Sequence, residues 1–276
     1  MTSQRHHIGA NLTRTETIAA TPVHLLAATL DLPDFDLKPD APIPPLWHWL
    51  YFLPDDRFAD LAEDGHPRRG DFYPASLPRR RMFGGATIAF HRPLRIGETA
   101  VCRTEIVGID ERDGQAGPLV LLRLLRQIEG EAGPAVTELQ TILYTDSPPG
   151  SATTDEAVTP GAEWEHEVVP DSRMLFRFSA LTFNTHRIHY DFPYTTEVEG
   201  YPGLVVHGPL TALLLAELAR SQGVALEQFE FRATAPVFAG EVVQLRGTPT
   251  LEGAELAAYR DGDVVMQATA RGVASG

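Results

Sequence analysis

The stretch GPLTALLLAELARSQG, Gly208 to Gly223, decides the fold of this 276-residue chain. An apolar stripe recurs in it at helical spacing, Pro209 lies early in the segment, and Gly223 closes its end, as expected for a helix. The stripe consists of Leu210, Leu213, Leu214 and Leu218. The pattern predicts a buried central helix.

Strand-like runs surround this helix in the sequence. Apolar and β-branched residues fill them, and glycine or aspartate turns separate them, which favours hairpin-connected antiparallel strands. The runs are TAVCRTEIVGID, GPLVLLRLLRQIEG and AVTELQTILYTD in the first half, and EVVQLRGTPTLEG, AELAAYRDGD and VVMQATARGV in the second. Asp261-Gly262 is typical of a tight hairpin turn.

A short internal repeat divides the chain. RPLRIGE at Arg92–Glu98 and APVFAGE at Ala235–Glu241 share a proline, an apolar residue and Gly-Glu at an offset of 143 residues, and strand-like sequence follows each. Between them, residues 147–170 are rich in Pro, Gly, Ser, Thr and acids. We therefore predict domains at 1–146 and 171–276, joined by a linker at 147–170.

Each half has one candidate for a main helix. In the first half, PPLWHWLYFLPDD at Pro44–Asp56 is the best counterpart of the central helix, and TPVHLLAATL at Thr21–Leu30 predicts an additional one. One helix wrapped by an antiparallel sheet, twice over, is an α+β arrangement.

Composition narrows the function. The formal charge of −14 argues against nucleic acid, and no apolar run is long enough to span a membrane. The N-terminal residues lack the apolar stretch of a signal peptide, so we expect a cytoplasmic protein. The single cysteine, Cys102, is expected to be a buried small hydrophobe.

Residues that can move protons cluster at positions 184–191. Asn184, His186, Arg187 and His189 fall within six residues, and Asp191 follows. Histidine titrates near neutrality, and asparagine can hold a water or hydroxyl, so the cluster predicts an acid/base site in which Asp191 could orient an imidazole. Metal binding by His186, His189 and Asp191 or His207 matches no strong zinc signature, so we predict no metal.

The segment VVHGPL at Val205–Leu210 supplies the other half of the predicted site. A helix that begins at Gly208 presents unpaired N–H groups and a positive dipole end. These groups suit the oxygen of a polarised thioester carbonyl, although an ordinary helix start has the same sequence.

Five arginines form a basic patch at Arg68, Arg69, Arg79, Arg80 and Arg81. The patch is either a solvated loop or a grip on phosphates or carboxylates, for which a guanidinium is well suited.

The loop and the HG-opened helix together resemble the hydratase motif of MaoC-like (R)-specific enoyl-thioester hydratases. That family has the hotdog fold, and its loop reads approximately Ser-Gly-Asp-x-Asn-Pro-apolar-His where this chain has Thr182 to His189. The resemblance implies that His189 is the catalytic histidine and that Gly208 holds the thioester oxygen. Asn184 stands where the family usually has its catalytic aspartate, so it would position water, or Asp191 would substitute as the acid.

FSALTFNTHRIHYD, PPLWHWLYFLP and RRRMFGGATIAFHRPLRIGE extend the resemblance to nearly the whole chain. They are similar to two-hotdog proteins related to mitochondrial-type 3-hydroxyacyl-thioester dehydratases and to mesaconyl-C4-CoA and itaconyl-CoA hydratases. The resemblance implies a double hotdog in which the N-terminal domain, without a catalytic loop, shapes the acyl pocket.

The implied reaction is reversible hydration of an enoyl-CoA, a C5 dicarboxylic one giving citramalyl-CoA, with no cofactor. Arg187, or one of Arg79, Arg80 and Arg81, would pair with a distal carboxylate, and His186, His207 and Asp191 complete the predicted substrate site. The alternatives are a 3-hydroxyacyl-CoA or acyl-carrier-protein dehydratase, a hotdog thioesterase, and a non-catalytic acyl-CoA binding protein. Hotdog sheets often pair edge to edge, so the chain either acts as a pseudo-dimer or forms a homodimer.

Overall fold

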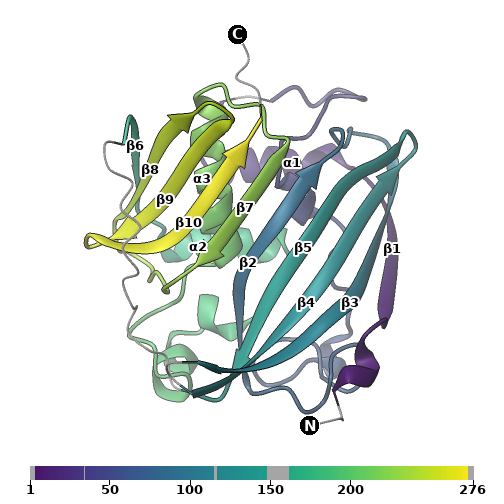
Figure 1. Cartoon of the computed structure of the whole chain (residues 1–276), viewed down its shortest axis with the longest axis vertical. Coiled ribbons are helices and arrows are strands. Elements are labelled where there is room, and N and C mark those ends of the chain that lie inside the picture. The colour runs from purple at the N-terminus through teal and green to yellow at the C-terminus, as the bar shows by residue number, and fades with distance from the viewer. Residues whose placement is uncertain (1–3, 34, 115–116, 148–161, 273–276) are drawn as a thin grey trace.

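The computed structural model describes residues 4–33, 35–114, 117–147 and 162–272. Within them, the strands form one antiparallel sheet in the order β1-β3-β4-β5-β2-β7-β10-β9-β8-β6 (Figure 1). In the first half these are β1 (Asn11–Thr17), β2 (Arg80–Phe90), β3 (Thr99–Gly114), β4 (Gly117–Gly130) and β5 (Gly133–Thr145). In the second half they are β6 (Trp164–Val168), β7 (Gln228–Ala233), β8 (Val243–Thr250), β9 (Gly253–Arg260) and β10 (Asp263–Arg271).

The sheet is built from two copies of one topology. In each half, counting strands along the chain, the spatial order is first, third, fourth, fifth, second. The copies meet where β2 pairs with β7, from Gly85 opposite Arg232 to Ala89 opposite Gln228. The repeated Pro-to-Gly-Glu motifs connect β2 to β3 and β7 to β8, so both occupy the same place in their copies.

The strand predictions are confirmed. All six strand-like runs are strands, and each half contributes three consecutive hairpin-connected ones. Asp261 and Gly262 join β9 to β10 with φ of 51° and 87°. Two successive positive φ values are those of a type I′ turn, in which the glycine avoids a steric cost.

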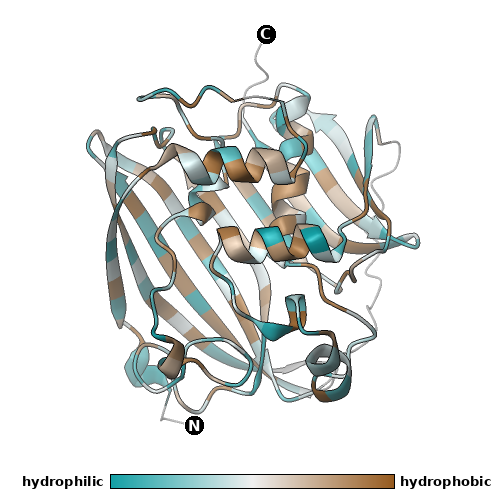
Figure 2. Ribbon diagram, turned by 180° about the vertical axis from the view of Figure 1, so that it is seen from behind, coloured by the Kyte–Doolittle hydropathy of each residue, from teal (hydrophilic) through white to brown (hydrophobic). Residues whose placement is uncertain are grey.

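Among the described residues, three α-helices lie against one face of the sheet (Figure 2). They are α1 (Ala20–Thr29), α2 (Ser172–Leu181) and α3 (Gly208–Ser221). The α3 side chains from Leu210 to Ala219 are all buried, which confirms the central helix, and α1 confirms the helix predicted at Thr21–Leu30. Within the described part of the chain, no helix combines the length and apolar character needed to cross a membrane.

The helix predicted at Pro44–Asp56 is wrong. Only Trp47–Leu50 is helical, as the single 3-10 turn η2, and Leu46 before it has φ of 69°. The turn directs two indoles to buried acids: Trp47 Nε1 donates to Glu217 and Trp49 Nε1 donates to Glu138, at 2.8 and 2.9 Å. Tertiary hydrogen bonds and flanking prolines outweigh helical packing here.

Within the predicted linker, Trp164–Val168 forms the edge strand β6, paired with β8. Residues 148–161 of the linker lie outside the described residues, and the domain boundaries themselves stay predictions. Cys102 is buried in the core, as expected.

Candidate functional site

Helix α2 delivers Asn184 to the site. Asp171 caps the helix by accepting from the N–H groups of Arg173 and Met174, and the chain turns sharply at Phe183, whose φ is 48°. The Asn184 N–H donates to the Ser179 carbonyl at 2.9 Å, and its Oδ1 accepts from the His186 N–H at 3.0 Å. With its oxygen engaged, Asn184 can offer its NH2 group as a donor.

His189 ends the 3-10 turn η4 (Arg187–His189) and is buried. Its Nδ1 lies 2.7 Å from the Val205 carbonyl, which can only accept, so Nδ1 carries the proton and the lone pair is on Nε2. Burial lowers the pKa of His189 to about 4, although the bond to Val205 opposes this shift. The imidazole is therefore a neutral base at physiological pH.

His207 connects His189 to the start of α3. The two imidazoles stack with centroids 3.6 Å apart and planes at 20°, and His207 Nε2 lies 2.8 Å from the Ser179 hydroxyl. His207 is the N-cap residue of α3, so Gly208, the first helical residue, follows it directly. Pro209 has no N–H, and the first hydrogen bond within the helix starts only at Thr211. The N–H of Gly208 is a donor at the positive end of the helix dipole.

Arg187 and Asp191 pair with each other instead of facing His189. The Arg187 guanidinium donates twice to Asp191 Oδ2, at 2.8 and 3.0 Å, and stacks on the Tyr194 ring. Asp191 Oδ1 accepts from the Tyr194 N–H. Neither side chain makes a hydrogen bond to an imidazole among the described residues.

The arginine patch separates into different environments. Arg79 and Arg80 both form ion pairs with the buried carboxylate of Glu199, and Arg69 donates to the backbone carbonyls of Leu77, Pro78 and Arg79. Arg81 instead extends to a histidine of the N-terminal half, with its Nη1 2.9 Å from His66 Nε2.

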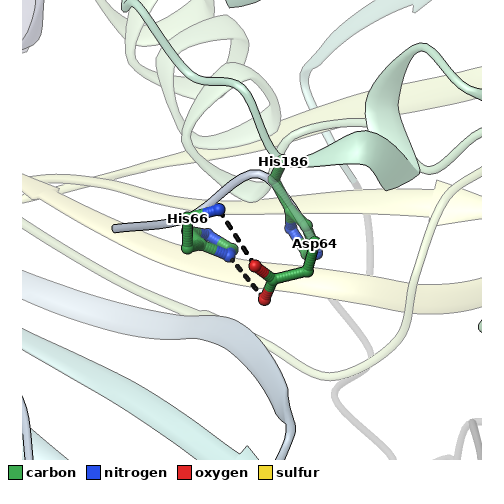
Figure 3. A group of neighbouring side chains, drawn as sticks. All are labelled: Asp64, His66 and His186. Atoms are coloured by element: carbon green, nitrogen blue, oxygen red, sulfur yellow. Dashed lines mark hydrogen bonds and ion pairs between the residues drawn. The ribbon is translucent and has the colours of Figure 1, made fainter. Parts of the chain in front are cut away.

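The N-terminal half contributes residues that the sequence did not indicate. Asp64 and His66 lie on a loop whose backbone docks on the 184–191 segment: the Arg187 N–H donates to the Asp64 carbonyl at 2.9 Å. The His66 ring lies 4.2 Å from the His186 ring, and Figure 3 shows both histidines around Asp64. The sequence feature that could have indicated this loop is Asp64-Gly65-His66, in which a glycine separates an acid from a histidine.

Asp64, His66 and His186 place ligand atoms within 4.8 Å of one another, a spacing that fits a metal ion. The hydrogen bonds disfavour that use. Asp64 accepts from the His66 N–H and lies 3.1 Å from its Nδ1, while the Arg81 cation occupies Nε2. A divalent ion here would meet a guanidinium, so the cluster is better suited to hydrogen bonding than to metal binding.

A pocket of about 650 Å³ opens between the two halves of the chain. Asn184 and Pro209 line it from the second half, and His66, Arg81 and Tyr144 line it from the first. Phe83 and Phe178 give it apolar walls. His189 lies behind this lining, 7% exposed, in ring contact with His186 and His207.

The fold and the site define a class of protein: a duplicated hotdog-type sheet around a central helix, with the neutral imidazoles of His189 and His207 at the start of that helix. The chain belongs to the hydroxyacyl-thioester dehydratase type 2 family, whose model matches residues 46–239. This confirms the resemblance to mitochondrial-type 3-hydroxyacyl-thioester dehydratases that FSALTFNTHRIHYD, PPLWHWLYFLP and RRRMFGGATIAFHRPLRIGE indicated.

Two curated relatives cover most of the chain. The chain is 46% identical to the mesaconyl-C(4)-CoA hydratase of Chloroflexus aurantiacus over 88% of each chain. It is 26% identical to the mitochondrial hydroxyacyl-thioester dehydratase type 2 of Schizosaccharomyces pombe, over 83% of this chain and 87% of the relative.

Solved structures confirm the double hotdog fold. A MaoC-like dehydratase from Phytophthora capsici superposes with a TM-score of 0.72 over 99% of both chains at 17% identity. A Mycobacterium tuberculosis protein described as having a double hotdog fold matches with a TM-score of 0.58, at 16% identity, over 95% of this chain and 94% of that one.

Proposed function

We propose that this chain adds water reversibly to the double bond of an enoyl-CoA thioester, and that the substrate is mesaconyl-C4-CoA, which becomes citramalyl-CoA. The relative of 46% identity, named as a mesaconyl-C(4)-CoA hydratase, supports the substrate. One observation carries the reaction: the neutral His189 imidazole, with its lone pair on Nε2, stacks on His207, the residue that begins the buried helix α3.

The proposed roles follow from the hydrogen bonds. Asn184 donates to a water oxygen, and His189 Nε2 accepts a proton from that water. The water oxygen bonds to the β-carbon while the π electrons move toward the thioester oxygen, where the Gly208 N–H stabilises the enolate. His189 then returns its proton to the α-carbon, so the sum is addition of one water molecule. None of these steps requires a cofactor.

The experiment is mass-spectrometric detection of water addition by the purified protein to mesaconyl-C4-CoA, itaconyl-CoA and crotonyl-CoA. We expect a gain of one water with mesaconyl-C4-CoA. Hydration of crotonyl-CoA alone would contradict the dicarboxylic substrate and favour the second candidate.

The second candidate is a dehydratase of 3-hydroxyacyl-CoA or acyl carrier protein, which the family and the fission-yeast relative favour. A thioesterase is less consistent with the site. Such an enzyme needs an accessible carboxylate near the thioester, whereas the carboxylate of Asp64 is engaged by the N–H and the ring of His66. Release of free CoA thiol without water addition would instead indicate a thioesterase.

We also propose that the protein acts in the cytoplasm and forms a homodimer. Edge strands β1 and β6 are the elements through which hotdog sheets can extend. Sedimentation analysis distinguishes the 30.3 kDa monomer from a dimer.

A further inference from the structure

Three of the four arginines that line the pocket form no ion pair among the described residues, and they differ in what their guanidinium groups contact. Four arginines line the pocket: Arg14, Arg68, Arg69 and Arg81. Arg14 forms an ion pair with Asp55, Arg68 donates to the Leu61 carbonyl, and Arg69 donates to three carbonyls. Arg81 likewise forms no ion pair among the described residues, but its guanidinium contacts the side chains of His66 and Tyr144 instead of backbone carbonyls.

The histidines around Arg81 add no positive charge to that of the arginines. Burial lowers the pKa of His66, and the Arg81 charge lowers it further, against the effect of Asp64. Burial also lowers the pKa of His186 well below its usual value. Both imidazoles are neutral at physiological pH, and the Asp64 carboxylate is one imidazole away from the guanidinium.

Building on the proposed function, we propose that Arg81 binds a carboxylate attached to the β-carbon of the acyl group, and that Asp64 and His66 are positioning residues that aim its guanidinium. An ionised Asp64 accepts the Nδ1 proton of His66, which fixes the lone pair on Nε2. That lone pair accepts one Arg81 N–H at 2.9 Å. The guanidinium also bonds to Tyr144 and lies over the ring of Tyr73. Because a guanidinium has five N–H donors, a carboxylate can bind in addition to these partners.

The chemistry of the substrate requires such a group near the water. In mesaconyl-C4-CoA, the free carboxylate is on the same carbon that receives the hydroxyl. A group that binds it must therefore lie close to Asn184 and His189. The rings form a continuous path from Arg81: His66 is 4.2 Å from His186, and His186 is 5.5 Å from His189, centroid to centroid. Arg81 and Asn184 also line the same pocket.

The test uses two saturated ligands that cannot react. Succinyl-CoA carries a carboxylate on its β-carbon, and butyryl-CoA carries a methyl group there. We expect Arg81→Gln to weaken succinyl-CoA binding roughly 30-fold or more, because a charge-assisted pair is lost, and to change butyryl-CoA binding less than about 3-fold. Isothermal titration calorimetry measures both. Equal weakening of the two ligands, or no weakening of either, would overturn the proposal.

Matched variants separate charge from position. Arg123→Gln, at an arginine of strand β4 that pairs with Asp110, should leave both affinities unchanged. Arg81→Lys keeps the charge without the fork and should retain part of the preference for succinyl-CoA, and it replaces Arg81→Gln if that variant fails to fold. Asp64→Asn and His66→Gln should reduce the ratio of the two affinities. A merely structural role would weaken both ligands together.

The design distinguishes two failures. If the wild-type protein hydrates no dicarboxylic substrate yet Arg81→Gln lowers succinyl-CoA affinity selectively, the reaction is wrong and the anion site is right. If the wild-type protein hydrates mesaconyl-C4-CoA and Arg81→Gln lowers turnover of mesaconyl-C4-CoA and crotonyl-CoA equally, the reaction stands and the role of Arg81 is wrong.

Discussion

His189 and Asn184 show how two side chains of modest reactivity become a directional pair. The Val205 carbonyl selects the His189 tautomer, and the His186 N–H selects the Asn184 amide orientation. His189 can then accept a hydrogen bond and Asn184 can donate one. A water molecule needs both, because it must be held through its oxygen and lose a proton.

Removal of the imidazole should abolish most of the turnover. We expect His189→Ala to lower kcat by roughly 10²- to 10⁴-fold, the range for loss of a general base. Initial rates of water addition to mesaconyl-C4-CoA measure the effect. Retention of the wild-type kcat would assign the base to another group.

The pH profile reports the same residue. The lone pair of His189 is lost only as the pH falls through about 4, where this imidazole becomes protonated. We expect kcat/KM to lack an inflection between about pH 5.5 and 7.5 and to decline toward pH 4. Rates after brief exposure to each pH provide the test, and an acidic limb centred near 6.5 would contradict a buried neutral base.

Asn184 can be tested by comparing two replacements. Asn184→Ala removes the donor and should lower kcat by about 10- to 10³-fold. Asn184→Asp keeps an acceptor for the His186 N–H and introduces the carboxylate usual in MaoC-like hydratases, so it should retain more activity. Steady-state kinetics rank the variants, and an Asp variant as impaired as the Ala variant would show that the amide donor is essential.

At the scale of elements, the loop that carries Asp64 and His66 is held against the 184–191 segment. Gly65 has φ of 91°, and a Cβ there would lie 1.7 Å from the Thr185 carbonyl oxygen. The Thr185 hydroxyl also donates to the Gly65 carbonyl. The two halves of the chain approach each other so closely here that only glycine fits.

Two glycines of this loop allow a matched comparison. Gly65→Ala should displace the loop and lower activity more than about 10-fold, because it moves His66 and the segment before His189. Gly70 also has a positive φ, 129°, but a Cβ added there would meet nothing within 4 Å. Gly70→Ala should cost only backbone strain, roughly 1–3 kcal/mol in the free energy of unfolding, with activity retained. Steady-state kinetics and chemical denaturation compare the two variants. Equal losses of activity would contradict the expectation that the close contact at Gly65 positions the site.

At the scale of the whole molecule, five histidines are held neutral by burial: His48, His66, His186, His189 and His207. An unfolded histidine titrates near 6.5. Between that pH and the lowered folded value, the unfolded chain binds more protons, so stability is lost as the pH falls. For His189, the pH range over which this contribution to stability is lost runs from about 6.5 to about 4.

Buried acids extend the effect to lower pH. Burial alone would raise the pKa of Glu138, but Arg126 and hydrogen bonds lower it to about 2, so its contribution is lost as the pH falls from about 4.5 toward 2.

We therefore expect the melting temperature to fall steadily from pH 7 to pH 4. The reduced negative charge at low pH acts in the opposite direction, and added salt screens that repulsion but not the buried groups. Calorimetry at low and high salt measures both effects. An unchanged or higher melting temperature at pH 5 in high salt would contradict the prediction.

Local patterns were sufficient for the elements that satisfy their own hydrogen bonds. The leucine stripe of α3, the hairpin runs and Asp261-Gly262 predicted correct structures because their periodicity and turn chemistry act within a few residues. The helix prediction at Pro44–Asp56 was wrong because the indoles of Trp47 and Trp49 donate hydrogen bonds to acids 170 and 89 residues away. A local sequence pattern carries no information about such distant partners.

The sequence by itself determined the duplicated hotdog framework, the helix that begins at Gly208 and the histidine loop. Each of these features follows from a pattern among residues that are close in the sequence. Only the tertiary structure decided which partner each arginine meets. Arg79 and Arg80 turn to Glu199, Arg187 turns to Asp191, and Arg81 turns to His66. All four look alike in the sequence, because a guanidinium takes its role from the acceptors that folding brings to it: Arg187 finds one four residues away, whereas Arg79 and Arg80 meet an acid about 120 residues away.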